Sequence, residues 1–290
     1  MASDVENIRA SRPFDLYSEH QSGITEEEFR SLCSGSPIWH SVDLGDLFIE
    51  GARKNSTALL QELRFADLPD LRGKTVLDIG AFGGWYSFEA ERRGASRVVA
   101  LDYYSWAIDW QKLGPYQAAE RAAGRIPNAY QLPDHVIDEV GQPGRSAFDA
   151  TKKALGSAVE PVLGRVEEYD PGEPFDVVLF LGVLYHCEDP LGTLRKVASL
   201  TKDRLIVETA GVYVPACEDK AVWEFYGDDS ANQDITTWWA PNDKALVDML
   251  KAVGFDHVEI KSGAKRYRGV VHAALNPIRI WAHAWRDADS

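Results

Sequence analysis

Apolar residues recur along the chain with two spacings, and these spacings predict alternating strands and helices. Around Val76, the run TVLDIG predicts a buried strand, WYSFEAERRG a helix that ends at Gly94, and RVVALD a second buried strand. A strand–helix–strand unit implies two parallel strands joined by a right-handed crossover.

The alternation continues towards the C-terminus. Helices are predicted in TKKALGSAVE, DPLGTLRKVASLT and PNDKALVDMLKAVGF, and strands in FDVVLFLGVLYH, DRLIVET and DHVEIKS. The segment GVVHAAL is expected to pair beside DHVEIKS and to finish the sheet. Together these elements predict an α/β fold.

Two segments lie outside this alternation. Residues 1–70 are predicted to form an N-terminal extension, with a short helix in EEEFRSL capped by Thr25 and an irregular hairpin over residues 35–51. Residues 113–150 contain two interruptions rich in Pro and Gly and are too long for a plain connection. We therefore predict two regions, the extension and a domain over residues 71–290 that carries a lid insertion at 113–150.

Composition narrows the class of protein. The 290 residues are 45% hydrophobic, and no window approaches the run of roughly 18 apolar residues that a spanning helix needs. The leading residues MASDVENIRA contain no apolar signal segment, so we expect a soluble cytoplasmic protein without a membrane partner. Three widely spaced cysteines fit neither a disulfide framework nor a zinc site, so we expect reduced thiols and no metal.

Net charge bears on the partner. The formal charge of -14 disfavours nucleic acid, because affinity for a phosphate backbone rests mainly on clustered Lys and Arg. The charge therefore favours a small-molecule partner, although a local basic face within an acidic total stays compatible with it. The sequence is also compatible with a homodimer.

A glycine-rich turn follows the first strand of the predicted domain. Its residues, Gly80 to Gly84, miss the G-x-G-x-x-G spacing of a dinucleotide site, and Trp85 and Tyr86 are bulky where a pyrophosphate would approach the helix. Asp102, at the tip of the second strand, is placed to accept hydrogen bonds from a ribose, which NAD and S-adenosylmethionine share. The turn thus disfavours an NAD-dependent oxidoreductase. Asp102 alone does not distinguish between the two cofactors.

Three stretches carry a family resemblance: VLDIGAFGG, VVALD and FDVVLFLGVLYHCEDPLGTLRKV. They resemble the motifs of class I S-adenosylmethionine-dependent methyltransferases, in the form found in the tRNA wobble-uridine carboxymethyltransferase group and its small-molecule relatives. The resemblance covers about residues 36–275, and GVLYH followed by DPL is its more specific part. It implies a Rossmann-like seven-stranded methyltransferase sheet whose last strand runs antiparallel, with S-adenosyl-L-methionine as cofactor.

The resemblance also implies which residues bind that cofactor. The glycines would approach its methionine part, Asp78 would orient the turn or the amino group, and Asp102 would hold the ribose. A tyrosine two positions after Asp102 is a candidate for stacking on the adenine. The cofactor-binding set is Asp78, Gly80, Gly83, Asp102, Tyr104, Arg165, Val166 and Leu181.

Candidates for catalysis and substrate binding come from strand ends and aromatic residues. Residues just past the carboxyl end of a parallel strand line the ligand crevice, which favours Tyr185 and His186. His186 is our first candidate for a general base, followed by Glu208 or His40. The substrate candidates are Trp39, His40, Trp238, Trp239 and Arg268. For most of these residues a purely structural role is an equal alternative.

These residues predict a methyltransferase that acts on a small molecule, such as a specialised metabolite, by in-line methyl transfer. One alternative is a tRNA wobble-uridine (carboxy)methyltransferase, and another is a non-catalytic S-adenosylmethionine-binding protein. The resembled group binds a carboxylated cofactor with a lysine before the first motif, the tyrosine of GVLYH and an arginine near the C-terminus. Tyr185 matches and Arg268 is a plausible match, but the lysine has no counterpart, so we predict plain methyl transfer.

Overall fold

The structure is a computed structural model that describes residues 6, 9–10, 12, 14–52, 67–127, 132–215, 217–228, 230–231, 234–264 and 278–287. The chain forms two compact units. The first comprises residues 1–115 and 133–164, and the second residues 116–132 and 165–290. The predicted boundary at residue 70 and the lid at 113–150 stay predictions.

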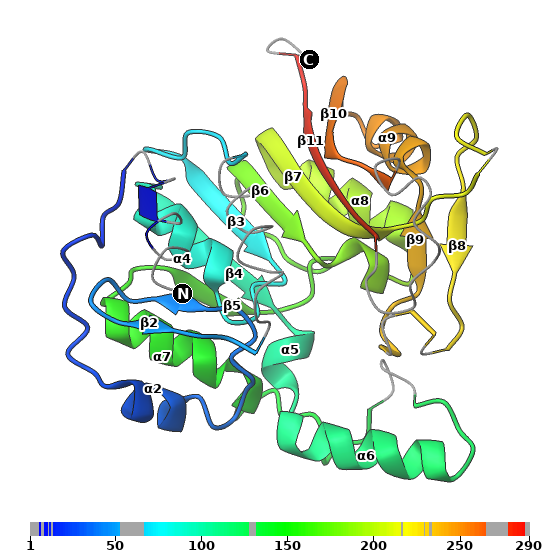
Figure 1. Ribbon diagram of the computed structural model, residues 1–290. Coiled ribbons are helices and arrows are strands. Elements are labelled where there is room, and N and C mark those ends of the chain that lie inside the picture. The colour runs from blue at the N-terminus through cyan, green and yellow to red at the C-terminus, as the bar shows by residue number, and fades with distance from the viewer. Residues whose placement is uncertain are drawn as a thin grey trace. The chain divides into compact units, whose positions relative to one another are not determined.

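Three parallel strands form the centre of the first unit: β3 (Thr75–Ile79), β4 (Arg97–Asp102) and β5 (Glu160–Leu163). The apolar runs of β3 and β4 are buried almost throughout, as expected for parallel strands covered on both faces. Helix α4 (Trp85–Arg92) contacts β3 and β4, and α7 (Ser146–Leu155) precedes β5 (Figure 1). The predicted strand, glycine turn, helix and strand are therefore present.

The N-terminal segment packs on this unit. Helix α2 (Glu26–Leu32) begins at Thr25, whose hydroxyl accepts from the backbone of Glu28 while the Glu28 carboxylate accepts from the backbone of Thr25. Strands β1 (Val42–Asp43) and β2 (Phe48–Ile49) form a short antiparallel hairpin. The predicted helix and irregular hairpin are both found.

The connection between β4 and β5 is more helical than the sequence suggested. It contains α5 (Tyr104–Ala107), α6 (Trp110–Ala122) and the 3-10 helix η1 (Pro143–Arg145). The first expected interruption, at Gly114 and Pro115, lies inside α6, where Pro115 is the sixth helical residue and cannot donate a backbone hydrogen bond to Gln111. The helix expected in TKKALGSAVE is also misplaced, since α7 begins earlier, at Ser146, and ends at Leu155.

The second unit contains the parallel pair β6 (Phe175–Leu181) and β7 (Thr201–Gly211), with β10 (His257–Ser262) and β11 (Ile278–Trp285) beyond them. Asp189 caps helix α8 (Pro190–Ser199) and Asn242 caps helix α9 (Asp243–Ala252), and both cap residues accept a backbone N–H with their side chains. The 3-10 helix η2 (Leu184–His186) follows β6, and a hairpin joins β8 (Trp223–Phe225) to β9 (Trp239–Pro241).

The strands form a seven-stranded mixed sheet in the order β10-β11-β7-β6-β3-β4-β5 (Figure 1). Strand β11 runs antiparallel to both β7 and β10. The antiparallel last strand was expected. The segment GVVHAAL (269–275) lies outside the described residues, and the pairing strand is IRIWAHAW, just after it.

Candidate functional site

The glycine turn between β3 and α4 is held by hydrogen bonds from its own backbone. The N–H of Gly80 donates to the carbonyl of Leu101 at 2.8 Å, and the N–H of Phe82 donates to Asp102 Oδ2 at 2.9 Å. Three turn residues have a left-handed backbone: Gly80 (φ 75°), Phe82 (φ 49°) and Gly84 (φ 77°). For Phe82 this conformation is strained, and its contacts with Asp102 and with Trp106 Nε1 compensate.

The two predicted acids of this unit lie buried at adjacent strand ends. Asp102 accepts from the backbone of Phe82 with one oxygen and from that of Ser105 with the other. Burial raises the pKa of Asp102, and these hydrogen bonds oppose the rise. Burial also raises the pKa of Asp78 to about 7, and the negative charge of Asp102 adds to this rise. A 2.6 Å hydrogen bond from the Ser87 hydroxyl opposes it. Asp102 therefore braces the turn while retaining lone pairs for a ligand hydroxyl.

Neighbouring glycines in the turn have opposite surroundings. A Cβ built on Gly83 would meet no atom of the described residues within 4 Å, so that face of the turn is open. A Cβ on Gly84 would lie 2.5 Å from the rings of Phe88 and Phe148. The open face at Gly83 and the carboxylate of Asp102 thus fit a ligand that approaches the backbone closely.

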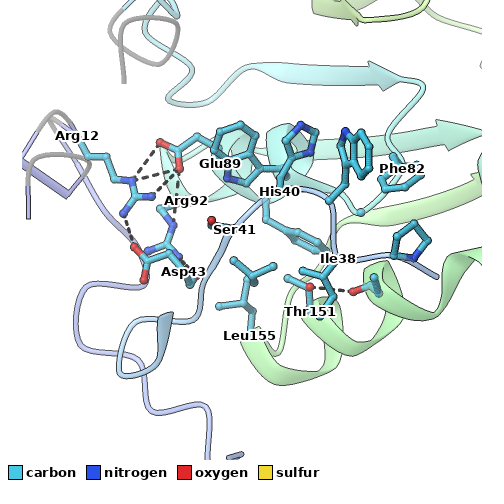
Figure 2. A pocket seen from close by; sticks show the side chains of 17 residues that line it. Arg12, Ile38, His40, Ser41, Asp43, Phe82, Glu89, Arg92, Thr151 and Leu155 are labelled. Carbon is cyan, nitrogen blue, oxygen red and sulfur yellow. Dashed lines mark hydrogen bonds and ion pairs between the residues drawn. The ribbon is translucent and has the colours of Figure 1, made fainter. Parts of the chain in front are cut away.

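Trp39 and His40 lie at a small pocket of the first unit (Figure 2). Its volume is about 30 Å³, which holds roughly two water molecules. The ring of His40 stacks on Trp85 with centroids 4.9 Å apart, and the indole of Trp39 is 40% exposed. Gly83 also lines this pocket. A substrate role for Trp39 and His40 stays a prediction.

Buried ion pairs form the far side of that pocket. Arg12 pairs with Glu89 at 3.0 Å and with Asp43 at 2.9 Å, and all three side chains are at most 6% exposed (Figure 2). Arg92 and Arg93 add pairs to Asp15 and Glu89. These contacts fasten the N-terminal segment to α4.

In the second unit, polar groups converge where β6 ends. Leu181 pairs with Glu208 across β6 and β7, and Gly182 follows with φ 76°. A Cβ on Gly182 would lie 3.6 Å from the Tyr185 hydroxyl and 3.7 Å from Glu208 Oε2. The structure therefore brings Leu181, Tyr185 and Glu208 around one point. Glu208 lies within β7, which continues to Gly211, so its predicted place at the end of that strand was wrong.

His186 is half-buried and is fixed by residues that the sequence did not indicate. Its Nδ1 lies 2.7 Å from the carbonyl oxygen and 2.8 Å from the hydroxyl of Thr236, and the same hydroxyl lies 2.6 Å from Asp234 Oδ1. Burial lowers the pKa of His186, and the charge of Asp234 opposes that decrease. The imidazole is therefore held neutral near pH 7. No spacing in the sequence links residues 186 and 234.

Arg279 is a further charged residue that sequence reasoning missed. Its guanidinium carbon lies 4.7 Å from the centre of the Tyr185 ring, and its Nε lies 3.6 Å from Glu208 Oε1. Its Nη1 is buried and makes no hydrogen bond within the described structure. Arg268, the arginine predicted for this region, lies outside the described residues. One signal was available, because Arg279 is a charged residue within a mostly apolar strand.

The remaining predicted residues are dispersed. Tyr104 begins α5 and is half-buried, whereas Arg165 is exposed and Val166 buried just after β5. Trp238 and Trp239 are both half-buried, and both rings lie against Phe225, at 6.2 Å and 4.9 Å between centroids. The backbone N–H of Trp238 donates to the carbonyl of Tyr185.

Within the described residues, no three His, Cys, Asp or Glu side chains are grouped so that they could hold a metal ion. No helix in the same part of the chain has the length and apolar character needed to cross a membrane.

Comparisons with known proteins agree on one family. Residues 52–260 match the family model described as a methyltransferase domain. The tRNA U34 carboxymethyltransferase of Pseudomonas aeruginosa (strain LESB58) is 28% identical over 250 residues, which cover 86% of this chain and 65% of that protein. That of Desulfotalea psychrophila is 24% identical over 200 residues, covering 67% and 48%. The chain thus spans about half to two thirds of the length of these relatives.

A solved structure shows the same fold. The N-terminal domain of EvdMO1, crystallised in the presence of SAH and D-fucose, superposes with a TM-score of 0.55 at 13% identity. The match covers 90% of this chain and 96% of that domain.

Proposed function

The chain belongs to the methyltransferase domain family as a class I S-adenosyl-L-methionine-dependent methyltransferase, and on this premise we propose that it methylates a small molecule, such as a specialised metabolite. The observation that carries the proposal is the turn of the first unit. There, Asp102 braces the backbone at Phe82 while Gly83 leaves an open face.

The residues of this turn would hold the methyl donor. Gly80 and Gly83 let the backbone approach the methionine part, and Asp102 accepts from the ribose hydroxyls. Tyr104, Arg165, Val166 and Leu181 complete the proposed contacts. When bound, S-adenosyl-L-methionine supplies a methyl group on a positively charged sulfur, and no metal is needed for that chemistry.

The polar cluster of the second unit would serve the acceptor. An acceptor hydroxyl or acidic carbon must lose its proton, and His186 is the proposed base, because its neutral imidazole carries a lone pair on Nε2. Tyr185 and Glu208 supply a hydroxyl and a carboxylate near Gly182 that orient the acceptor. Trp238 and Trp239 would add aromatic binding area.

Release of S-adenosylhomocysteine tests the proposal. Purified protein is incubated with S-adenosyl-L-methionine and a panel of hydroxylated and aminated small molecules, with Asp102→Ala as control. We expect release with at least one small molecule and much less release with the control. Tight cofactor binding without release for any acceptor would instead favour a non-catalytic binding protein. Release with tRNA alone would overturn the small-molecule assignment.

A second candidate is modification of tRNA wobble uridine. Two observations favour it. Arg279 lies over the Tyr185 ring, and the resembled tRNA-modifying group binds its carboxylated cofactor with a tyrosine and an arginine. Similar proteins are also named tRNA U34 carboxymethyltransferase. The net charge of -14 argues against it. A gel-shift titration with bulk tRNA at low salt separates the two, because even nonspecific RNA binders retain RNA there. We expect no shift.

A further inference from the structure

A chain of hydrogen bonds runs from a carboxylate to the His186 ring within the second unit. Asp234 Oδ1 lies 2.6 Å from the hydroxyl oxygen of Thr236, which in turn lies 2.8 Å from His186 Nδ1. The carbonyl oxygen of Thr236 lies 2.7 Å from the same nitrogen. Asp234 Oδ1 also accepts the backbone N–H of Thr236 at 2.9 Å, so the carboxylate and the threonine are fixed to each other.

The partners decide which ring nitrogen carries the proton. A carbonyl oxygen only accepts, so Nδ1 must donate to Thr236. The Thr236 hydroxyl gives its single proton to Asp234, and its oxygen is therefore also an acceptor towards Nδ1. Both contacts require the Nδ1–H tautomer, which leaves the lone pair of the neutral ring on Nε2.

Charged groups of opposite sign face this ring. Asp234 favours the imidazolium, whereas Arg279, from β11, disfavours it. Glu208, from β7, lies 3.6 Å from the Arg279 guanidinium and offsets part of its charge. The Tyr185 ring, from η2, lies 4.1 Å from the imidazole, centre to centre. Asp234 is thus the acid linked to His186 through hydrogen bonds.

We infer that Asp234 and Thr236 are positioning residues, which fix His186 as the Nδ1–H tautomer and stabilise its imidazolium once Nε2 has taken the proton of the methyl acceptor. The inference rests on the proposed function, in which His186 is the base. The proton moves from the acceptor atom to Nε2, and the electron pair of its former bond becomes available to the attacking atom. The positive charge on the ring is then stabilised by the hydrogen bonds to Thr236 and by the nearby charge of Asp234.

Nitrogen-15 NMR of the imidazole rings tests the inference without any acceptor. A pH titration reports both the tautomer and the pKa of His186, and His186→Gln assigns its signals. We expect the Nδ1–H tautomer in the wild-type protein. Asp234→Asn should lower the pKa of His186 by about one pH unit, because a negative charge near the ring is lost. Thr236→Val should lower it less, since the carbonyl of residue 236 still accepts from Nδ1.

Matched variants separate this role from general packing. Thr236→Ser keeps the hydroxyl and should titrate as the wild type. Thr237→Val removes the neighbouring buried hydroxyl, which makes no hydrogen bond within the described structure, and should also leave the pKa unchanged. Asp228→Asn removes an exposed charge in the same connection and controls for net charge.

Two results would overturn the inference. One is an Nε2–H tautomer in the wild type. The other is an unchanged His186 titration in both Asp234→Asn and Thr236→Val, with folding verified by thermal unfolding. Calorimetry with S-adenosyl-L-methionine tests the proposed function separately. If the wild-type protein does not bind the cofactor, methyl transfer is refuted. If it binds the cofactor but the His186 titration is unchanged in both variants, only the role of Asp234 and Thr236 is refuted.

Discussion

Gly83 and Gly84 follow each other in the glycine turn but should respond in opposite ways to a side chain. Gly83→Val should leave a folded protein, because a Cβ there would meet nothing within 4 Å among the described residues, yet abolish S-adenosyl-L-methionine binding by filling the ligand space. Gly84→Ala should lower the free energy of unfolding by about 2 kcal/mol or more, because φ is 77° and two rings crowd the site. Calorimetry and chemical denaturation measure the two effects. Normal cofactor binding by Gly83→Val would show that the turn faces elsewhere.

Asp102 should contribute to both binding and folding. Asp102→Ala should weaken S-adenosyl-L-methionine binding by about 2 to 3 kcal/mol, since two hydrogen bonds to a charged acceptor are lost. It should also lower the melting temperature, because the N–H groups of Phe82 and Ser105 lose their acceptor. Asp70→Ala, which removes an exposed carboxylate, is the control. Unchanged affinity for Asp102→Ala would remove this residue from the site.

Asp78 should make stability depend on pH. Its pKa is about 7 in the folded protein and about 3.9 when unfolded, so the folded state holds a proton that the unfolded chain releases between these values. Stability contributed by this group is therefore present at low pH and is lost as pH rises towards 7. The loss between pH 5 and pH 8 should be about 2 to 3 kcal/mol larger in the wild type than in Asp78→Asn. Urea denaturation at both pH values measures it, and equal losses would contradict the prediction.

At the scale of elements, the N-terminal segment depends on buried charges. Arg12→Ala should lower the free energy of unfolding by about 3 kcal/mol, because it leaves Glu89 and Asp43 buried with fewer partners (Figure 2). Arg72→Ala breaks an exposed pair with Asp70 and should leave the free energy of unfolding nearly unchanged. Urea denaturation compares the two variants. Equal costs would show that the Arg12 pairs add nothing to stability.

The sequence predicted most elements of the sheet but not the residues around His186. Continuous apolar runs such as TVLDI are typical of parallel strands that are buried on both faces of the sheet. The strands β3, β4, β6 and β7 were therefore predictable. Strand β11 was not predicted, because IRIWAHAW carries Arg279 and His283, which weaken its apolar pattern. Asp234 and Thr236 could not be predicted, since they reach His186 from a connection 48 and 50 positions further along the chain. Arg279 reaches Tyr185 only through strand pairing.

At the scale of the whole molecule, the choice of cofactor decides between the two candidate functions. A carboxylated S-adenosylmethionine needs cationic partners for its extra carboxylate in a buried pocket. The resembled group supplies a lysine, a tyrosine and an arginine. Tyr185 and Arg279 lie together and could act as the last two, but Arg279 already lies 3.6 Å from Glu208. The segment before the glycine turn offers His40 in place of the lysine, and Arg53 and Lys54 lie outside the described residues.

We therefore predict that the protein prefers S-adenosyl-L-methionine to its carboxylated form. The extra carboxylate of that form would be held by Arg279, whose charge Glu208 already neutralises in part. This attraction is too weak to offset the desolvation of the carboxylate, which costs several kcal/mol. Competition binding measures the preference directly, with Glu208→Gln as the informative variant, because it should release Arg279 and shift the preference towards the carboxylated cofactor. Tighter wild-type binding of the carboxylated form would contradict plain methyl transfer and favour tRNA as the substrate.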